Sequence, residues 1–354
     1  MTLTIAEVQA GCEWQRRLCE KNGAPTYVAL IDELLARLGR DDVVTKLLTS
    51  EEQDPVQSAL CLRLFGAVNR VALAQSAPWI RQRYPVLGGE TDTSRVAGEF
   101  IDFLKANLAQ VSNEMKIGVQ TNEVSRAAPL SAAINFVATE IGLPVRLLEV
   151  GASGGLNLLM DQYYVDAGTS SWGPADSPLK LVGQFAHGAP PTVQADVVER
   201  RGCDLNPIDV HQDASAQLLE SFVWPEHVDR GRRVRAAIKV ARSQPPLRID
   251  RSDATPWVKE VARGGDVGVA TVVFHSIVLP YFDPAARDEF VSTVRELGES
   301  ATEDRPFAWV SMEPTADDSS VVELTCELWP TGRRMLLGRM NPHGMGVSWH
   351  PVAQ

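Results

Sequence analysis

A glycine-rich turn near the middle of the chain holds residue types well suited to bind a small ligand. The apolar segment Val145–Val150 leads into Gly151-Ala-Ser-Gly-Gly155, and a helical pattern starts at Leu156. Glycine has no Cβ and tolerates positive φ, so such a turn lets the backbone approach another group closely. A strand, a glycine turn and a helix N-terminus together form the ligand-binding corner of open α/β sheets. Three chemistries use a corner of this kind.

The first chemistry is dinucleotide binding, and the glycine spacing argues against it. The G-x-G-x-x-G fingerprint needs glycine at positions 151, 153 and 156, where the chain has Gly151, Ser153 and Leu156. An acidic residue that binds the ribose should follow about 20 residues later. Asp161 and Asp166 are the candidates there, and neither ends a predicted strand.

The second chemistry is hydrolysis by a serine nucleophile. The turn satisfies the G-x-S-x-G pattern of a nucleophile elbow, in which a histidine activates the serine. Asp253 or Glu313, and then His343, follow Ser153 in the order that such a triad takes. The elbow normally follows several strands of its sheet, whereas the region before residue 144 is predicted to be helical. The G-x-S-x-G pattern and the residue order keep a hydrolase as an alternative, although the predicted topology argues against it.

The third chemistry is binding of S-adenosylmethionine (SAM). Such a site needs an acid at the end of the first strand, a second acid at the next strand tip for the ribose, and a polar group near the following tip for the adenine. Glu149 precedes the turn, Asp204 ends the apolar run Val197–Cys203, and Asp253 follows the next predicted strand. Each acid lies at a carboxyl end, where open sheets bind ligands. The residues predicted to bind the cofactor are Glu149, Gly151, Ser153, Gly155, Asp204, Asp253 and Ala254.

Two residues after later strands are candidates for catalysis. His275 follows the predicted strand Val267–Phe274, and its ordinary pKa of about 6.5 suits a general base that removes a proton from the acceptor. The structural alternative is a histidine that caps the strand end. Glu313 follows Phe307–Met312 and is predicted to face the same crevice as a second base or a substrate anchor. Its alternative is an exposed loop acid.

The segment before the helix that enters the core is predicted to line the cleft. Arg126 suits a carboxylate on the substrate, although Thr121 or Asn122 could instead cap the following helix. The residues predicted to contact the substrate are Asn122, Glu123, Arg126, Ser276 and Tyr281.

The elements that position these residues change character near residue 144. Apolar residues recur at helical spacing up to about residue 143, and apolar strands then alternate with helices. Pro330-Thr-Gly332 predicts a turn between two final antiparallel strands. We predict a helical N-terminal domain over residues 1–128 and an α/β domain over 129–354, with a Rossmann-like, mostly parallel twisted sheet and a terminal hairpin. The Gly-, Pro- and Ser-rich stretch 166–191 is predicted to be an insertion.

The bulk composition excludes several classes. The chain has 354 residues and a net charge of −11, which disfavours a nucleic-acid binder. Its five cysteines are scattered without CxxC spacing, which predicts reduced thiols and no metal site. The sequence starts without a signal-peptide pattern, and no apolar stretch approaches the roughly 20 residues of a membrane span. We therefore expect no membrane partner and a cytoplasmic location.

Several motifs carry a resemblance to known families. Residues 144–354 resemble the fold of class I SAM-dependent methyltransferases, which ends with an antiparallel strand inserted in a parallel sheet. The whole chain resembles a bacterial, largely actinobacterial, family of unknown function. The motifs behind the family resemblance lie at residues 121–126, 149–157, 172–178, 199–207, 224–225, 274–276, 309–314, 329–330 and 343–344.

The resemblance implies SAM as cofactor and methyl transfer to a small-molecule acceptor. Oxygen or carboxyl acceptors are favoured over nitrogen, because no Asn/Asp-Pro-Pro-aromatic motif follows Phe274. Two departures are Ser153 at the usual middle glycine and a gap of 53 residues (204 − 151) from Gly151 to Asp204, where the compact unit has about 20. The helical domain is expected to shape the acceptor pocket or to form a homodimer. A protein that binds SAM without catalysis is the non-enzymatic alternative.

Overall fold

The structure is a computed structural model that describes residues 2–120 and 122–350. Its contacts divide the chain into two compact units. The helical unit comprises Met1–Thr121 with Asp213–Arg232, and the sheet unit comprises Asn122–Gln212 with Arg233–Gln354. The boundary predicted at residue 128 would give two domains, each of them a single continuous segment. The contacts instead group residues 122–128 with the sheet and return residues 213–232 to the helices.

The described elements of the helical unit start with ordinary capping chemistry. Thr4 Oγ1 accepts from the Glu7 N–H (3.2 Å) and the Glu7 carboxylate accepts from the Thr4 N–H (2.7 Å), which closes a capping box. Pro25 is the first residue of one helix, and Asp92 Oδ1 accepts from the Ser94 N–H (3.2 Å) at the start of another. The helices are α1 (Ile5–Lys21), α2 (Pro25–Arg37), α3 (Asp42–Thr49), α4 (Leu60–Ala74), α5 (Pro78–Arg83), α6 (Thr93–Ala106), α7 (Leu108–Glu114) and α9 (Asp213–Ser221).

Buried hydrogen bonds explain why α9 belongs to the helical unit although it follows a strand of the sheet unit in the chain. Asn69 Nδ2 on α4 donates to the Ser221 carbonyl (3.0 Å), and Arg70 Nη1 donates to Ser221 Oγ (3.2 Å). The Thr26 N–H donates to Glu226 Oε1 (2.8 Å). Sequence periodicity carries no information about such distant polar partners, so the return of this segment was not predicted.

The sheet unit is built on a nine-stranded sheet in the order β5-β12-β11-β10-β9-β8-β1-β6-β7. Strands β7, β6, β1, β8 and β9 pair in parallel, and β10 and β11 add an antiparallel hairpin. The predicted α/β class with a large, mostly parallel sheet is therefore confirmed. The strands are β1 (Val145–Val150), β5 (Phe185–His187), β6 (Val197–Asp204), β7 (Arg248–Arg251), β8 (Ala270–Ser276), β9 (Phe307–Pro314), β10 (Val322–Trp329), β11 (Arg333–Met340) and β12 (Val347–Trp349).

The antiparallel end of the sheet differs from the one that the methyltransferase resemblance implies. Strands β9, β10 and β11 are neighbours in chain order, so the hairpin extends the sheet as a meander, and no strand that follows β9 in the chain is inserted among the parallel strands β7, β6, β1, β8 and β9. Strands β12 and β5 continue the sheet beyond β11.

The strand order reverses at β1. The chain runs from β1 to β6 and β7 on one side, and then returns to β8 and β9 on the other side. Open α/β sheets bind ligands outside the carboxyl ends of the strands at such a reversal. The carboxyl ends of β1 and β8 are therefore the place in this sheet where a ligand is expected.

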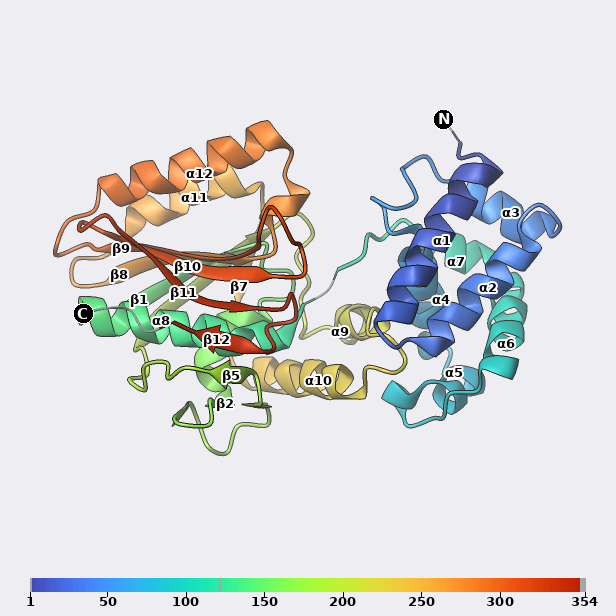
Figure 1. The fold of residues 1–354 in the computed structure, drawn as a ribbon, viewed down its shortest axis with the longest axis horizontal. Coiled ribbons are helices and arrows are strands. Elements are labelled where there is room, and N and C mark those ends of the chain that lie inside the picture. The colour runs from blue at the N-terminus through green and yellow to red at the C-terminus, as the bar shows by residue number, and fades with distance from the viewer. Residues whose placement is uncertain (1, 121, 351–354) are drawn as a thin grey trace. The chain divides into compact units, whose positions relative to one another are not determined.

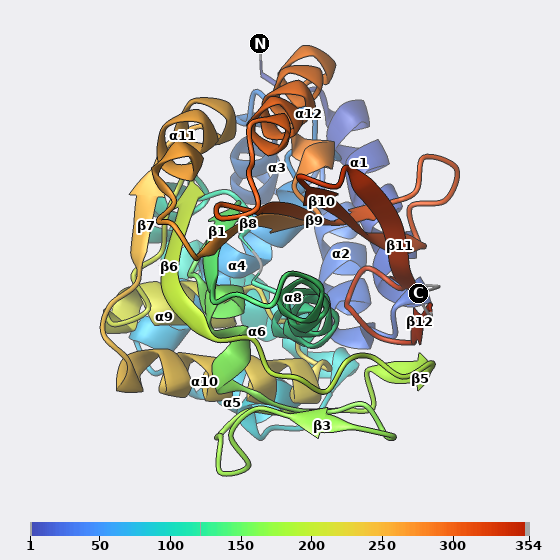
Figure 2. The same cartoon turned by 90° about the vertical axis from the view of Figure 1, so that its left-hand side faces the viewer.

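Helices cover both faces of the sheet, as Figures 1 and 2 show. Helices α11 (Ala254–Val261) and α12 (Pro284–Glu299) lie on one face, and α8 (Ala127–Ile141) lies on the other with the portion of α10 (Val228–Ser243) that belongs to this unit. Residues 127–137 of α8 are all buried. Four of these eleven residues are alanine, and such small side chains allow the helix to pack closely on the strands.

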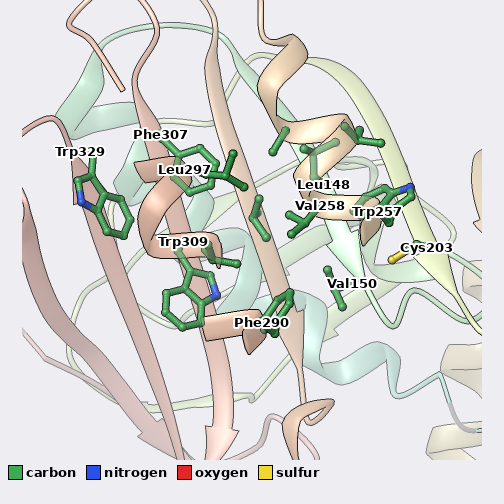
Figure 3. Packing of buried hydrophobic residues seen from close by; sticks show 14 residues of the cluster. Leu148, Val150, Cys203, Trp257, Val258, Phe290, Leu297, Phe307, Trp309 and Trp329 are labelled. Atoms are coloured by element: carbon green, nitrogen blue, oxygen red, sulfur yellow. The ribbon is translucent and has the colours of Figure 1, made fainter. Parts of the chain in front are cut away.

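The main apolar cluster lies between the sheet and the helices α11 and α12 (Figure 3). Leu148 and Val150 of β1 meet Trp257 of α11 and Phe290 of α12 in it. Gly298 lets the ring of Trp329 lie against α12, because a Cβ there would come within 2.4 Å of that ring. Trp309 and Trp329 also belong to the cluster.

The segment after the glycine turn is not the α-helix that the sequence predicted. It forms a 3₁₀ segment, η3 (Leu156–Gln162), with a kink at Leu159 (φ −98°, ψ 19°). The predicted insertion then forms a small three-stranded sheet in the order β3-β2-β4, from β2 (Tyr164–Asp166), β3 (Ser171–Trp172) and β4 (Lys180–Val182). The Tyr163 hydroxyl, directly after η3, donates to the carbonyl of Leu156, its first residue (2.5 Å).

Across the two described ranges, 2–120 and 122–350, we find no helix with both the length and the hydropathy that a membrane crossing requires.

Candidate functional site

The glycine turn has an unusual backbone. Gly151 and Gly155 both have φ of +70°, and Ser153 between them has φ of +52°. A side-chain-bearing residue in the left-handed region costs roughly 1–2 kcal/mol and is worth attention when it lies near a ligand site. The predicted Ser153 therefore occupies a strained position at the carboxyl end of β1.

The tip of β6 holds the turn in this conformation. Asp204 Oδ2 accepts from the Ser153 N–H (2.8 Å), and the Ser153 carbonyl accepts from the Ile208 N–H (3.1 Å). Asp204 Oδ1 also accepts from the Asn206 N–H (2.8 Å). The structure thus brings the predicted residues Asp204 and Ser153 together, through a backbone hydrogen bond that spacing alone did not predict.

Four oxygen atoms around the turn have no hydrogen-bond partner among the residues that the structure describes. They are Glu149 Oε2, Ser153 Oγ, Asn157 Oδ1 and Asn122 Oδ1, and all four are buried. Asn122 lies against the turn because its Nδ2 donates to the Ala152 carbonyl (3.1 Å). Buried polar atoms in folded proteins almost always have partners. A carboxylate and two amide oxygens only accept hydrogen bonds, so this cluster is complementary to a group that donates several.

Glu149 is the charged member of this acceptor cluster. The residue is 2% exposed, and burial raises the pKa of its carboxyl well above the ordinary value. The nearby charge of Asp204 raises this pKa further, while a hydrogen bond from Asn157 and the Arg126 guanidinium act in the opposite direction. A positively charged ligand group would favour the carboxylate. Asn157 was not predicted, although it is a polar residue in the apolar run 156–160.

His275 and Glu313 meet directly. His275 is fully buried, and its Nδ1 lies 2.6 Å from Glu313 Oε1. The Trp309 indole N–H donates to His275 Nε2 (3.0 Å). An indole nitrogen only donates, so this contact assigns the imidazole proton to Nδ1. Both ring nitrogens of His275 are therefore engaged within the protein, and this geometry suits a residue that orients Glu313 better than a general base.

Glu149, predicted to bind the cofactor, and His275, predicted to act in catalysis, lie on opposite faces of the sheet. In the register of β1 and β8, Glu149 is opposite Phe274 and Val150 is opposite His275. Successive side chains of a strand alternate between faces. Val150 belongs to the cluster under α11 and α12, and His275 packs against Phe290 there. Glu149 consequently points to the α8 face, and the sheet separates it from the His275 ring.

A short segment, called the strap below, crosses between the two faces at the carboxyl end of the sheet. The strap, Ser276–Val278, ends β8, and its Val278 Cγ2 fills the space where a Cβ on Gly151 would lie, at 2.4 Å. Glu313 Oε1 accepts from the Val278 N–H (2.9 Å). Arg126 Nη1 donates to the Ser276 carbonyl (3.1 Å). Gly151 is therefore required here for contact with the protein's own Val278.

Ile277 in the strap has φ of +53°, which is rare for a β-branched residue. Its N–H donates to the Met312 carbonyl (2.9 Å), which ties the strap to β9. Nothing in the sequence marks an isoleucine for this conformation. The strap is thus a component of the site that sequence reasoning missed.

The remaining predicted residues lie around this edge. Asp253 is exposed at the start of α11, and the preceding Ser252 N–H donates to the Asp204 carbonyl (3.1 Å). Ala254 follows as the first residue of α11. Tyr281 is 85% exposed. Glu123 is buried, and its Oε2 lies 3.1 Å from Nδ1 of His343.

The residues of the alternative hydrolase triad are not assembled around Ser153. No histidine in the described ranges hydrogen-bonds Ser153 Oγ. His343 instead contacts Glu123, and Glu313 contacts His275. The strained Ser153 is the one feature that this geometry shares with a nucleophile elbow.

A search of curated proteins returns no match to this chain. A family described as "Uncharacterized protein conserved in bacteria (DUF2332)" matches residues 10–349. Because this match covers nearly the whole sequence, the chain belongs to that family of bacterial proteins.

Proposed function

We propose that the sheet unit is a SAM-dependent methyltransferase that acts on a small-molecule acceptor. The observation that carries this proposal is the cluster of buried oxygen acceptors around the glycine turn, at the carboxyl end of β1 where the strand order reverses. An amino-acid ammonium group has three N–H donors and a positive charge. Such a group complements Glu149, Asn157 and Asn122. SAM carries one ammonium group in addition to its charged sulfur.

The tips of β6 and β7 support the same proposal. Asp204 and Asp253 lie at neighbouring strand ends, and the N–H of Ser252, which precedes Asp253, donates to the Asp204 backbone carbonyl. Carboxylates there suit the hydroxyl and amine donors of a nucleoside. When bound, SAM supplies a methyl group on a positively charged sulfur, which an acceptor displaces in line. The turn and strap would orient the reactants and exclude water, which supply much of the rate in such a transfer.

The arrangement of His275 favours acceptors that need no proton removal. Trp309 and Glu313 occupy both ring nitrogens, so His275 acts in this proposal as a positioning residue that holds Glu313. An ionised carboxylate attacks without a base, in line with the expected carboxyl- or oxygen-directed transfer. Glu313 Oε2, which has no partner in the described chain, stays as the second predicted base or anchor.

Calorimetric titration with S-adenosylhomocysteine (SAH) tests the proposal. We expect binding that Asp204→Ala abolishes and that the isosteric Glu149→Gln weakens at least tenfold. Asp166→Ala is the matched control, because Asp166 also ends a strand and accepts a backbone N–H two residues on, from Gly168 (2.8 Å), as Asp204 does from Asn206. Folded protein that binds no SAH would refute the proposal.

Further readouts separate the alternatives. Methyl transfer from radiolabelled SAM to small carboxylic acids would establish the enzyme, whereas SAH binding without transfer to any acceptor class would favour the non-catalytic alternative. Labelling of Ser153 by a serine-directed phosphonate, abolished in Ser153→Ala, would favour the hydrolase.

A further inference from the structure

Two buried thiols meet in the helical unit, away from the proposed site. Cys12 of α1 and Cys61 of α4 have their sulfur atoms 3.3 Å apart, with the Cys61 thiol donating to Cys12. Both residues are nearly inaccessible, at 1% and 2% exposure. A disulfide has an S–S distance of about 2.05 Å, so an approach of about 1.3 Å would join them.

The other thiols do not share this arrangement. Cys19 lies about two turns further along α1 and is fully buried, but its sulfur accepts from Gln15 Nε2 (3.5 Å). Cys203 and Cys326 are buried in the sheet unit. The geometry therefore singles out one pair among the five cysteines.

The contact also divides the chemistry between the two thiols. The hydrogen bond from Cys61 lowers the pKa of the Cys12 thiol, whereas this contact and burial raise the pKa of Cys61. The thiolate is the form that reacts with oxidants. Because the Cys61 S–H donates to the Cys12 sulfur and would stabilise a thiolate there, Cys12 is taken as the attacking residue and Cys61 as the resolving residue.

We propose that Cys12 and Cys61 form a reversible intramolecular disulfide when the protein meets a small hydroperoxide. The Cys12 thiolate attacks one peroxide oxygen, the O–O bond breaks, and hydroxide leaves. Cys12 then carries a sulfenic acid. Cys61 loses its proton and its sulfur attacks the Cys12 sulfur, the S–O bond breaks, and water leaves. Two thiols and hydrogen peroxide yield one disulfide and two waters, so the sulfurs are oxidised and the peroxide is reduced.

The consequence is a covalent link between α1 and α4. The bond would close a loop between residues 49 positions apart, which restricts the unfolded chain and raises the thermal midpoint of the helical unit. The oxidant must be small because both sulfurs are buried, and it enters when the helices open locally.

Thiol counting on the full chain tests the proposal. Reduced protein is treated with hydrogen peroxide and then unfolded in the presence of N-ethylmaleimide. Mass spectrometry of the intact chain gives the number of N-ethylmaleimide adducts. We expect the number of adducts to fall from five, the cysteine total, to three. Dithiothreitol should restore five, and peptide mapping should find Cys12 joined to Cys61. Cys19→Ser is the matched control and should lose one adduct while keeping the cross-link.

Three results would overturn the proposal. Folded protein could keep every alkylatable thiol under peroxide that oxidises the urea-unfolded chain. Cys12 could instead gain two oxygens without a cross-link, or the mapped link could involve Cys19. The peptide mapping uses the wild-type chain, so the outcome does not depend on whether a variant that lacks Cys12 would fold.

Discussion

At the scale of single residues, the site is defined by polar atoms that the protein leaves without partners. Glu149 is buried beside Asp204, an arrangement that penalises its ionised form. A protein tolerates such a penalty where a residue serves a function other than stability. Glu149 is therefore the residue at which the proposed function and stability should oppose each other.

This opposition predicts how Glu149→Gln changes stability with pH. The pKa of Glu149 is raised in the folded protein. Between the ordinary pKa of a Glu side chain and this raised pKa, the folded state therefore binds more protons than the unfolded state. Wild-type stability therefore falls as pH rises through that window, by at most about 1.4 kcal/mol per pH unit. The variant lacks this loss, so its advantage should be absent near pH 4 and grow with pH.

Urea unfolding of the two proteins at a series of pH values measures the difference. Glu323→Gln, which replaces a partly exposed carboxylate on β10, is the control and should show no such trend. A constant offset between Glu149→Gln and the wild type at every pH would contradict the prediction.

At the scale of elements, the strap at the end of β8 holds a strained β-branched residue beside the site. Ile277 is left-handed, and its own N–H donates to the Met312 carbonyl. Its neighbours Val278 and Ser276 are hydrogen-bonded to Glu313 and Arg126. These hydrogen bonds force a conformation that the side chain disfavours. The strap is thus positioned by β9 and the residues before α8, rather than by its own sequence.

The strain predicts an inverted order of two substitutions at Ile277. Both Ile277→Ala and Ile277→Gly remove the side chain beyond Cβ, but only glycine adopts positive φ without cost. We expect the glycine variant to be the more stable by about 1 kcal/mol. At Val278, with φ of −114°, the alanine variant should be the more stable. Denaturant unfolding of the four proteins gives both differences, and alanine ranking first at both positions would contradict this account.

At the scale of the whole molecule, the chain passes through the helical unit twice. Asn69 joins the two passes, since it donates to the Ser221 carbonyl and accepts from the Tyr84 hydroxyl (3.1 Å). Asn69→Ala leaves both buried groups without this partner, at about 1–3 kcal/mol each. We expect a destabilised helical unit and faster hydrogen exchange in residues 213–232.

Hydrogen exchange with mass spectrometry measures this effect. The control is Asn113→Ala, which removes an exposed asparagine whose Oδ1 accepts from Lys116 Nζ (3.2 Å). Unchanged exchange in residues 213–232 of Asn69→Ala would show that other contacts hold the returning segment.

The sequence by itself determined the α/β class, the family resemblance and the place of the glycine turn. These features depend on apolar periodicity and on residue types at short spacing, which are local properties of the chain. The carboxyl-terminal position of Glu149, Asp204 and Glu313 followed from strand prediction in the same way. The family match over residues 10–349 agrees with the predicted bacterial family.

Only the tertiary structure decided which of these residues meet. The strand register put Glu149 and His275 on opposite faces, and Trp309, 34 residues beyond His275, engaged its second ring nitrogen. The left-handed Ile277 and the return of residues 213–232 likewise depend on hydrogen bonds to residues distant in the chain. Such contacts join residues far apart in the chain, and local periodicity carries no information about them.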